Sequence, residues 1–246
     1  MFALMKETMG HYVKKTYLIS EFIVFLIFIY VFIIKVSKYT WGMDTYLIDL
    51  NVAIIFSCLL SAYRFFVYEG DKGKERIEKY GKIKYYFSKI FLCIFMNIAL
   101  IIMFSIVLYF NRLKGSNDII FYLKSLFPVF LNILIGTAAG ILFSPVVLSI
   151  HQVIHGIFII VVGINMTALS GFFPNSIVNY FFKVLMFLFP PIEQVISFSL
   201  NPVIDQFSIT TTIWALIYSF VLFYGGKKII EKKEIKYQKD NTISFE

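Results

Sequence analysis

The sequence predicts an all-α integral membrane protein with six transmembrane helices. Three observations predict this fold class: 59% of the 246 residues are hydrophobic, only 15% are charged, and the mean hydropathy is +0.79. An ordinary soluble domain carries roughly 25% charged residues, and a globule of this size leaves too much surface exposed to hide so many apolar side chains. The composition therefore argues against a soluble enzyme, a disordered chain and a fibrous protein.

The chain is also basic, with 23 Lys and Arg against 15 Asp and Glu and a formal net charge of +8. These residues lie between the apolar runs, where the positive-inside bias of membrane proteins explains them. No segment resembles a groove-reading motif, so we expect no nucleic-acid partner. Cys58 and Cys93 fall inside apolar runs and are typical of small buried residues, not of a disulfide or a metal site.

The N-terminal segment, residues 1–16, has the pattern of a short amphipathic helix. Phe2, Met5 and Met9 are its apolar positions, and Lys6 and Glu7 lie between them. We expect this helix to lie on the inner membrane surface ahead of the first span. The alternative is a frayed terminus.

Six apolar runs are long enough to cross a bilayer, which requires about 20 largely apolar residues. No small-x-small cleavage pattern follows the first run, so we expect it to remain as an anchor. Pro128 and Pro145 are expected to kink or end the fourth span. The predicted spans cover residues 17–36, 47–68, 90–110, 123–143, 149–170 and 209–224.

Residues 171–208 are apolar but are divided by prolines. The stretch between the first of these prolines and the next is too short to cross the membrane at about 1.5 Å per residue. We therefore expect an outer helical hairpin, either re-entrant or lying on the surface, which is tolerated at depth only where protein covers it. Its prolines and ionisable residues are Pro174, Pro190, Pro191, Pro202, Lys183 and Glu193.

The distribution of basic residues predicts the topology. With six spans, the cytoplasmic segments 1–16, 64–89 and 225–246 hold 3, 8 and 6 of the 23 Lys and Arg. One more crossing would place the Lys-rich tail outside, against the positive-inside bias. We therefore expect a multi-pass protein of the cell membrane with both termini cytoplasmic, although the connection 111–124 fits the bias poorly.

Residues 69–89 carry both charge signs, which topology alone does not require. Two oppositely charged pairs at i,i+4 spacing would support a short helix. The segment either docks a cytoplasmic partner or is a solvated basic loop that only sets the topology. The pairs are Lys74 with Glu78 and Glu75 with Lys79, in a stretch bracketed by Gly73 and Gly81.

An interfacial helix, a charged helix after the second span and a proline-cut hairpin before the sixth together resemble the permease subunits of ABC-2 type transporters. In that family the second span ends in a Glu, a Gly follows four residues later, and a coupling helix leads to a basic turn. Glu69 and Gly73 keep this spacing, while Gly81 replaces the usual proline of the turn. The resemblance assigns coupling to Glu69, Gly73, Arg76, Ile77, Lys79, Tyr80 and Lys82, with Lys84 and Lys89 completing the turn and the entry to the third span.

The resemblance implies a function in export. A separate cytoplasmic ATPase subunit would hydrolyse ATP with magnesium, and a second permease, identical or paralogous, would complete the transporter. The cargo would be an amphipathic peptide, a lipid-like molecule or a drug. The Phe-, Ile-, Lys- and Tyr-rich composition suggests a bacterial source, and the resemblance to small bacterial permeases implies the export of antimicrobial or cytolytic peptides. A non-transporting membrane scaffold or sensor subunit that recruits cytoplasmic partners is the alternative.

No catalytic residue and no cofactor of its own are expected in this chain. The phosphate-binding pattern G-x-x-x-x-G-K-[ST] is missing from the sequence, so ATP hydrolysis is assigned to a partner and the chain is not expected to be an enzyme. His151 and His155 share a helical face, but Gln152 stands where the zinc-protease pattern needs a Glu. We expect a polar patch there and no metal, with pH-sensitive gating left open.

Two further features concern the spans themselves. Gly136 and Gly140 form a small-xxx-small pattern, which we expect to pack against another helix of the same subunit in preference to a second subunit. Acidic residues near the middle of the membrane are expected in ion-coupled carriers, and the sequence shows none there. This disfavours secondary transport.

Overall fold

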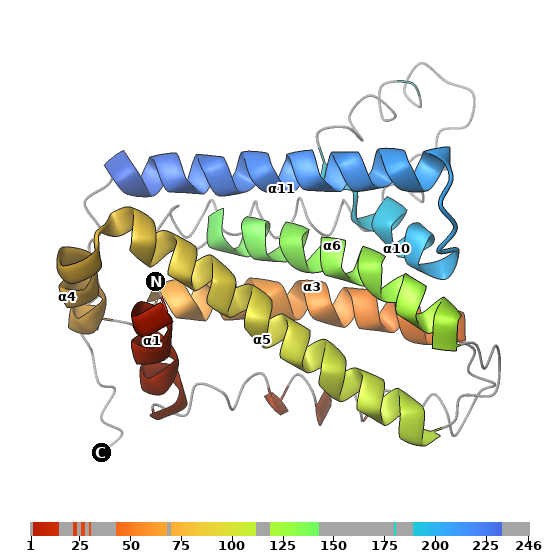
Figure 1. Ribbon diagram of the computed structural model, residues 1–246, viewed down its shortest axis with the longest axis horizontal. Helices are drawn as coiled ribbons and strands as arrows, with labels where there is room; N and C mark the ends of the chain where they lie inside the picture. Colours follow the sequence, from red (N-terminus) through yellow and green to blue (C-terminus); the bar gives the residue numbers. More distant parts are fainter. Residues whose placement is uncertain are drawn as a thin grey trace.

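The computed structural model describes residues 2–14, 22–23, 26–27, 30, 43–67, 70–111, 119–142, 180 and 189–232. All regular structure in this part of the chain is helical (Figure 1). The helices are α1 (Phe2–Lys14), α3 (Met43–Val67), α4 (Gly70–Tyr80), α5 (Lys82–Asn111), α6 (Ile119–Leu142), α10 (Ile192–Leu200) and α11 (Gln206–Lys232).

Four of these helices, α3, α5, α6 and α11, are long and apolar enough to cross a membrane. These four candidate spans indicate a membrane protein. They correspond to the second, third, fourth and sixth runs of the sequence. The predicted spans 17–36 and 149–170 lie outside the described residues, apart from five helical residues within the first.

The structure differs from the expected boundaries at the start of the third span. We expected a basic turn before residue 90, but α5 already begins at Lys82, and Lys82 and Lys84 belong to its first turn. Gly81 alone separates α4 from α5, because its φ of 85° ends one helix and its carbonyl accepts from the amide of Tyr85 at 3.1 Å. Glycine adopts this left-handed conformation without a steric cost, which allows a one-residue connection.

The helices α6 and α11 also extend further than expected. α6 already begins at Ile119, before the expected start at residue 123, and it continues through Pro128, while Pro145 lies outside the described residues. α11 begins after a reciprocal cap, in which the Ser208 amide donates to Asp205 Oδ1 at 2.7 Å and the Asp205 amide donates to Ser208 Oγ at 2.8 Å. It runs on to Lys232, where Glu231 pairs with Lys227 at 3.7 Å and with Lys228 at 3.6 Å.

The bundle has two distinct ends. α1 and α4 lie at one end, together with the start of α5 and the last turns of α3, α6 and α11; α10 lies at the other (Figure 1). We call these the α4 end and the α10 end. Thus α3, α6 and α11 run from the α10 end to the α4 end, and α5 runs in the opposite direction.

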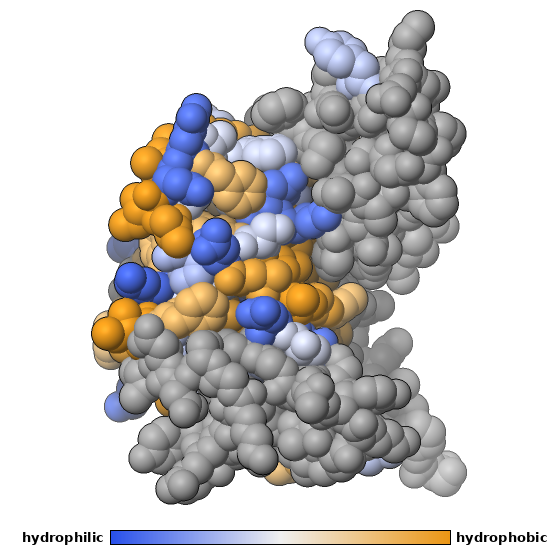
Figure 2. Space-filling model, turned by 90° about the vertical axis from the view of Figure 1, so that its right-hand side faces the viewer, coloured by the Kyte–Doolittle hydropathy of each residue, from blue (hydrophilic) through white to orange (hydrophobic). Residues whose placement is uncertain are grey.

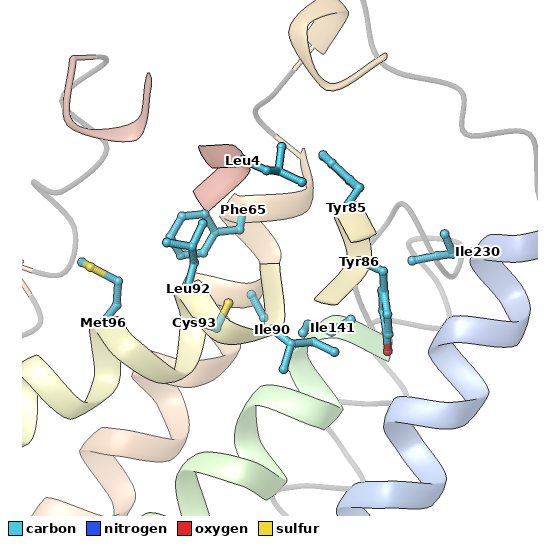
Figure 3. Packing of buried hydrophobic residues seen from close by; sticks show 11 residues of the cluster. Leu4, Phe65, Tyr85, Tyr86, Ile90, Leu92, Cys93, Met96, Ile141 and Ile230 are labelled. Atoms are coloured by element: carbon cyan, nitrogen blue, oxygen red, sulfur yellow. The ribbon is translucent and has the colours of Figure 1, made fainter. Parts of the chain in front are cut away.

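A hydrophobic cluster holds the α4 end together, and we call it the α4-end cluster (Figure 3). It joins side chains of α1, α3, α5, α6 and α11, so both the first and the last of the described helices contribute to one cluster. Burial of such side chains contributes roughly 25 cal/mol per Å² of apolar surface. The members are Leu4, Ala62, Phe65, Tyr85, Tyr86, Ile90, Leu92, Cys93, Met96, Ile141 and Ile230.

The closest packing in the bundle is that of α6 against α3. A Cβ at Gly136 would lie 2.9 Å from Cys58 Cβ, and one at Gly140 would lie 2.8 Å from Ala62 Cβ. Any residue larger than glycine would push the two helices apart at these positions. The small-xxx-small pattern of α6 therefore lies against α3 of the same chain.

The charged residues are unequally distributed between the ends. Among the described residues, Lys124 is the only basic residue placed towards the α10 end, and the other basic residues lie on α1, α4, the start of α5 and the last turns of α3 and α11. Viewed from the α10 end, the described surface mixes hydrophilic and hydrophobic side chains (Figure 2). The α4 end is thus the basic end of the bundle.

Candidate functional site: the contact between α1 and α4

α4 is the one described helix whose sequence is predominantly polar. It carries both charge signs over Gly70–Tyr80 and joins two apolar helices at the basic end of the bundle. The helix begins before the expected start, so Gly73 lies buried in its first turn and does not precede it. Glu69 lies outside the described residues.

Glu7 of α1 is the centre of the contact with α4. Its backbone oxygen accepts a hydrogen bond from the Arg76 guanidinium at 3.0 Å. Its carboxylate oxygen Oε1 accepts from the Tyr80 hydroxyl at 3.0 Å and pairs with Lys79 Nζ at 3.4 Å. Positions 76, 79 and 80 share one face of a helix. Three side chains from one turn of α4 therefore contact a single residue of α1.

α1 is itself fixed to the bundle. Leu4 is fully buried in the α4-end cluster, and Met5 and Met9 pack against the same cluster. Ile77 and Tyr80 of α4 pack there as well. The polar contact at Glu7 and the apolar contact beneath it therefore hold α4 in a defined orientation.

The residues expected to couple to a partner do not all face outward. Arg76 is only 8% exposed because it is turned towards α1, and Ile77 and Tyr80 are partly buried. Arg76 is thus engaged within the chain through its hydrogen bond to Glu7, and its role in coupling stays a prediction. Lys79 remains exposed beside the contact, and Lys82 is half-buried at the start of α5.

Glu75 and Glu78 form the outward face of α4 together with Lys79. Our sequence-based assignment did not include these two glutamates. The exposure of Glu75 and Glu78 could have been predicted from helical periodicity, because they lie on the side of the helix away from the apolar Ile77 and the small Gly73. The available surface of α4 therefore has acidic as well as basic character.

The neighbours of Glu7 shift the titration of its carboxyl group. The hydrogen bond from Tyr80, and secondly that from Lys79, lower the pKa of Glu7 below its ordinary value of 4.5. The pKa of Lys79 is raised, first by Tyr80 and then by Glu7. Both groups are therefore charged at neutral pH.

The contact between α1 and α4 is expected to weaken in acid. Because the folded-state pKa of Glu7 is lowered, its contribution to stability is complete above about pH 4.5 and is lost as the pH falls through the folded-state value. The difference in melting temperature between the native protein and Glu7→Gln, followed by circular dichroism, should therefore shrink below pH 4.5. An undiminished difference at lower pH would contradict the ionic role of Glu7, and Tyr80→Phe should give an intermediate profile.

Lys89 was expected at the entry to the third span and instead lies within α5, fully buried. Its ammonium group lies 4.9 Å from the ring centroid of Tyr85 and 5.7 Å from that of Phe65. Aromatic rings stabilise a cation most where water is displaced. Lys89 therefore joins α3 to α5 beneath the α1–α4 contact.

A buried polar network links α3, α6 and α10. Asn132 Nδ2 donates to Asn51 Oδ1 at 2.6 Å, and Asn51 Nδ2 donates to Ser199 Oγ at 2.9 Å. All three side chains are fully buried, and they come from α6, α3 and α10. The network therefore fixes the short helix α10 to the two most tightly packed spans.

The hairpin residues are only partly described. Pro190 and Pro191 are buried directly before α10, and Glu193 lies in its first turn. Pro174 and Lys183 lie outside the described residues, as do His151 and His155. The described residues contain no group of three or more His, Cys, Asp or Glu side chains able to hold a metal ion.

Comparison of the chain with protein families, with curated proteins and with solved structures finds no match in any of the three. The functional argument therefore depends on the residues and their geometry.

Proposed function

We propose that this protein is a six-span permease subunit of an ATP-binding cassette exporter of the ABC-2 type. It lies in the cell membrane with both termini cytoplasmic, and it binds cytoplasmic ATPase subunits through α4. A second permease, identical or paralogous, completes the transporter. ATP and magnesium bind to the partner ATPase, and this chain supplies the route for an amphipathic, lipid-like or drug-like cargo, with antimicrobial peptides as the favoured class.

The placement of the helix ends supports six spans. α1 lies at the α4 end, whereas α3 begins at the α10 end; likewise α6 finishes at the α4 end, whereas α10 lies at the opposite one. Each of these two connections must lead from one end of the bundle to the other, as the predicted spans 17–36 and 149–170 would. The basic character of the α4 end supports its assignment to the cytoplasm.

The contact of α4 with α1 is the observation that carries the docking proposal. A polar helix held by Glu7, with Glu75 and Glu78 left outward, presents charged groups in a fixed orientation at the cytoplasmic end. Fixed charges give a partner a specific orientation and a faster approach. A movement of α4 would be transmitted to α3, α5 and α11, because Ile77 and Tyr80 pack against the α4-end cluster that these helices share.

Reversal of one outward charge tests this proposal. Glu78→Lys should reduce the capture of a P-loop ATPase by the tagged, detergent-extracted protein about tenfold, which corresponds to about 1.4 kcal/mol. Asp44→Lys, which reverses the charge of an exposed residue at the α10 end, should leave the capture unchanged. Arg76 is unsuitable for this test, since its removal would also break the contact with α1.

Two results would contradict the proposal. Unchanged ATPase capture by Glu78→Lys, at native expression, would show that α4 is not the docking helix. If the native protein captures no P-loop ATPase, the permease function itself fails, and a non-transporting scaffold or sensor subunit becomes the better interpretation.

A further inference from the structure

The helix α11 turns most of its apolar surface outward. Only 22% of its apolar window is buried, against 50–72% in α3, α5 and α6. Its covered side lies against the bundle (Figure 1), where Tyr86 of α5 donates a hydrogen bond to the Phe223 carbonyl at 2.8 Å. The other side exposes Ile213, Ile217 and Phe220, which are spaced three and four residues apart and therefore form one stripe.

Towards the α4 end this stripe changes from aliphatic to aromatic and then to cationic. The rings of Phe220 and Tyr224 stack with their centroids 6.2 Å apart, and Lys228 Nζ lies 5.6 Å from the Tyr224 ring centroid. Both Tyr224 and Lys228 are half exposed. In membrane proteins tyrosine lies at the level of the lipid headgroups, and lysine extends its ammonium group towards water. These two side chains therefore mark the headgroup level of the leaflet at the α4 end.

The helix α5 shows the same order at the same depth. Lys84 is exposed in its first turn, and Phe87 and Phe91 are exposed one and two turns further along the span. Tyr86, which lies between Lys84 and Phe87 in the sequence, packs beside Gly226 of α11. Two helices that run in opposite directions therefore place the headgroup level at the same height of the bundle.

Two lysines at this level share one acidic partner. Lys227 Nζ lies 3.7 Å from Glu231 Oε1, and Lys228 Nζ lies 3.6 Å from Glu231 Oε2. Both distances are longer than an N–H···O hydrogen bond of about 2.7–3.2 Å, and an ammonium group has several N–H donors. Glu231 therefore holds the two ammonium groups near each other without using up their donors, and one positive charge is left unbalanced.

We propose that this outward face of α11 is a binding site for an anionic phospholipid of the leaflet at the α4 end. Lys227 and Lys228 bind the phosphate, and the Tyr224 hydroxyl offers a further donor beside them. An acyl chain lies along the exposed stripe between Phe220 and Ile209. This stretch measures roughly 17 Å along the helix, which matches one half of a hydrocarbon core about 30 Å thick. Lysines next to a span attract anionic headgroups more strongly than zwitterionic ones.

A second copy of the chain fits this face less well than an anionic lipid does. Most closed dimers have a two-fold axis, which would turn the lysine pair of one chain towards that of the other if α11 packed against α11. Like charges that face each other disfavour such a contact. A phosphate group instead balances the positive charge that Glu231 leaves.

The lipid preference is measured by native mass spectrometry of the full chain in detergent, with added dioleoylphosphatidylglycerol or dioleoylphosphatidylcholine. The native protein should bind the anionic lipid about tenfold more tightly, equivalent to about 1.4 kcal/mol. Lys227→Gln/Lys228→Gln should lose most of this preference, whereas Lys124→Gln, at an exposed position towards the α10 end, should retain it. An undiminished preference in the double variant would overturn the proposal.

Glu231→Gln provides a test in the opposite direction. Removal of this carboxylate frees both lysines from their competing anion, so the anionic lipid should bind about threefold more tightly, equivalent to about 0.7 kcal/mol. Asp44→Asn, the same loss of charge at an exposed position of the α10 end, should leave the affinity unchanged. Unchanged or weaker binding in Glu231→Gln would contradict the lipid site.

Disulfide crosslinking distinguishes a lipid from a second copy on this face. Ile217→Cys, oxidised with copper phenanthroline in membrane vesicles, should stay monomeric because lipid covers the stripe. The native Cys58 and Cys93 are fully buried and contribute no background. Efficient dimer formation by Ile217→Cys would show that the face is an interface between copies and would end the proposal. None of these measurements involves the ATPase, so the lipid site and the proposed permease function are tested separately.

Discussion

Gly140→Ala is expected to destabilise the protein by up to about 2 kcal/mol. The new Cβ would meet Ala62 Cβ at 2.8 Å, Leu59 Cα at 3.0 Å and the Cys58 carbonyl oxygen at 3.1 Å. Two of these atoms are backbone and cannot rotate away, so overpacking that typically costs about 1–3 kcal/mol outweighs the gain of about 1 kcal/mol from replacing glycine in a helix. Thermal unfolding in detergent, followed by a thiol-reactive dye that reports exposure of Cys58 and Cys93, measures the change.

A matched control lies on α11. A Cβ at Gly225 would meet nothing within 4 Å, so Gly225→Ala should raise the melting temperature slightly through helix propensity alone. The double variant Gly140→Ala/Ala62→Gly should recover part of the loss, because it removes the closest contact. If Gly140→Ala were as stable as Gly225→Ala, the close packing of α3 on α6 would be wrong.

Asn51→Ala is expected to cost about 2–4 kcal/mol. The substitution removes the acceptor for Asn132 Nδ2, which is left buried without this partner, and the donor to Ser199 Oγ, which keeps only its own hydrogen bond to the Ile196 carbonyl. A buried group that loses its partner typically costs about 1–3 kcal/mol, although hydrogen bonds between membrane helices are often worth less. The same thermal measurement in detergent applies.

Asn97→Ala is the control for Asn51→Ala. Asn97 is equally buried, but its amide donates to Cys93 O within its own helix, so its removal breaks no hydrogen bond between two of the described helices. It should cost about half as much as Asn51→Ala. A double-mutant cycle of Asn51→Ala with Asn132→Ala should show coupling, since the two residues share one hydrogen bond. Strict additivity would contradict the network.

The apolar runs predicted the four candidate spans well because hydrophobic length is a local property. The third and sixth runs lie within α5 and α11, and the second and fourth runs match α3 and α6 up to their last residue, which is outside the described residues. The ends were less predictable: α5 starts at Lys82 because a single glycine turns the chain. A run of Lys residues before a span is equally compatible with a loop and with a first helical turn, so composition alone did not distinguish them.

In the candidate site, too, the helix could be predicted from the local sequence, whereas its contacts could not. The charge pattern of residues 69–89 predicted a short helix, and α4 is that helix. Which of its charges face outward depends on α1, since Glu7 binds Arg76 and leaves Glu75 and Glu78 exposed. Residues so far apart in the sequence carry no local signal of this contact.

Composition and hydropathy were sufficient to predict a helical membrane protein whose basic residues are concentrated between particular apolar runs. The contacts between helices became known only from the fold: Gly140 packs on α3, Glu7 binds α4, and Asn51 binds both α6 and α10. The free energy of transferring apolar side chains from water to lipid is a sum over the residues of one segment, so the sequence of that segment is enough to predict it. Packing and hydrogen bonding between helices depend on distances that no single segment encodes.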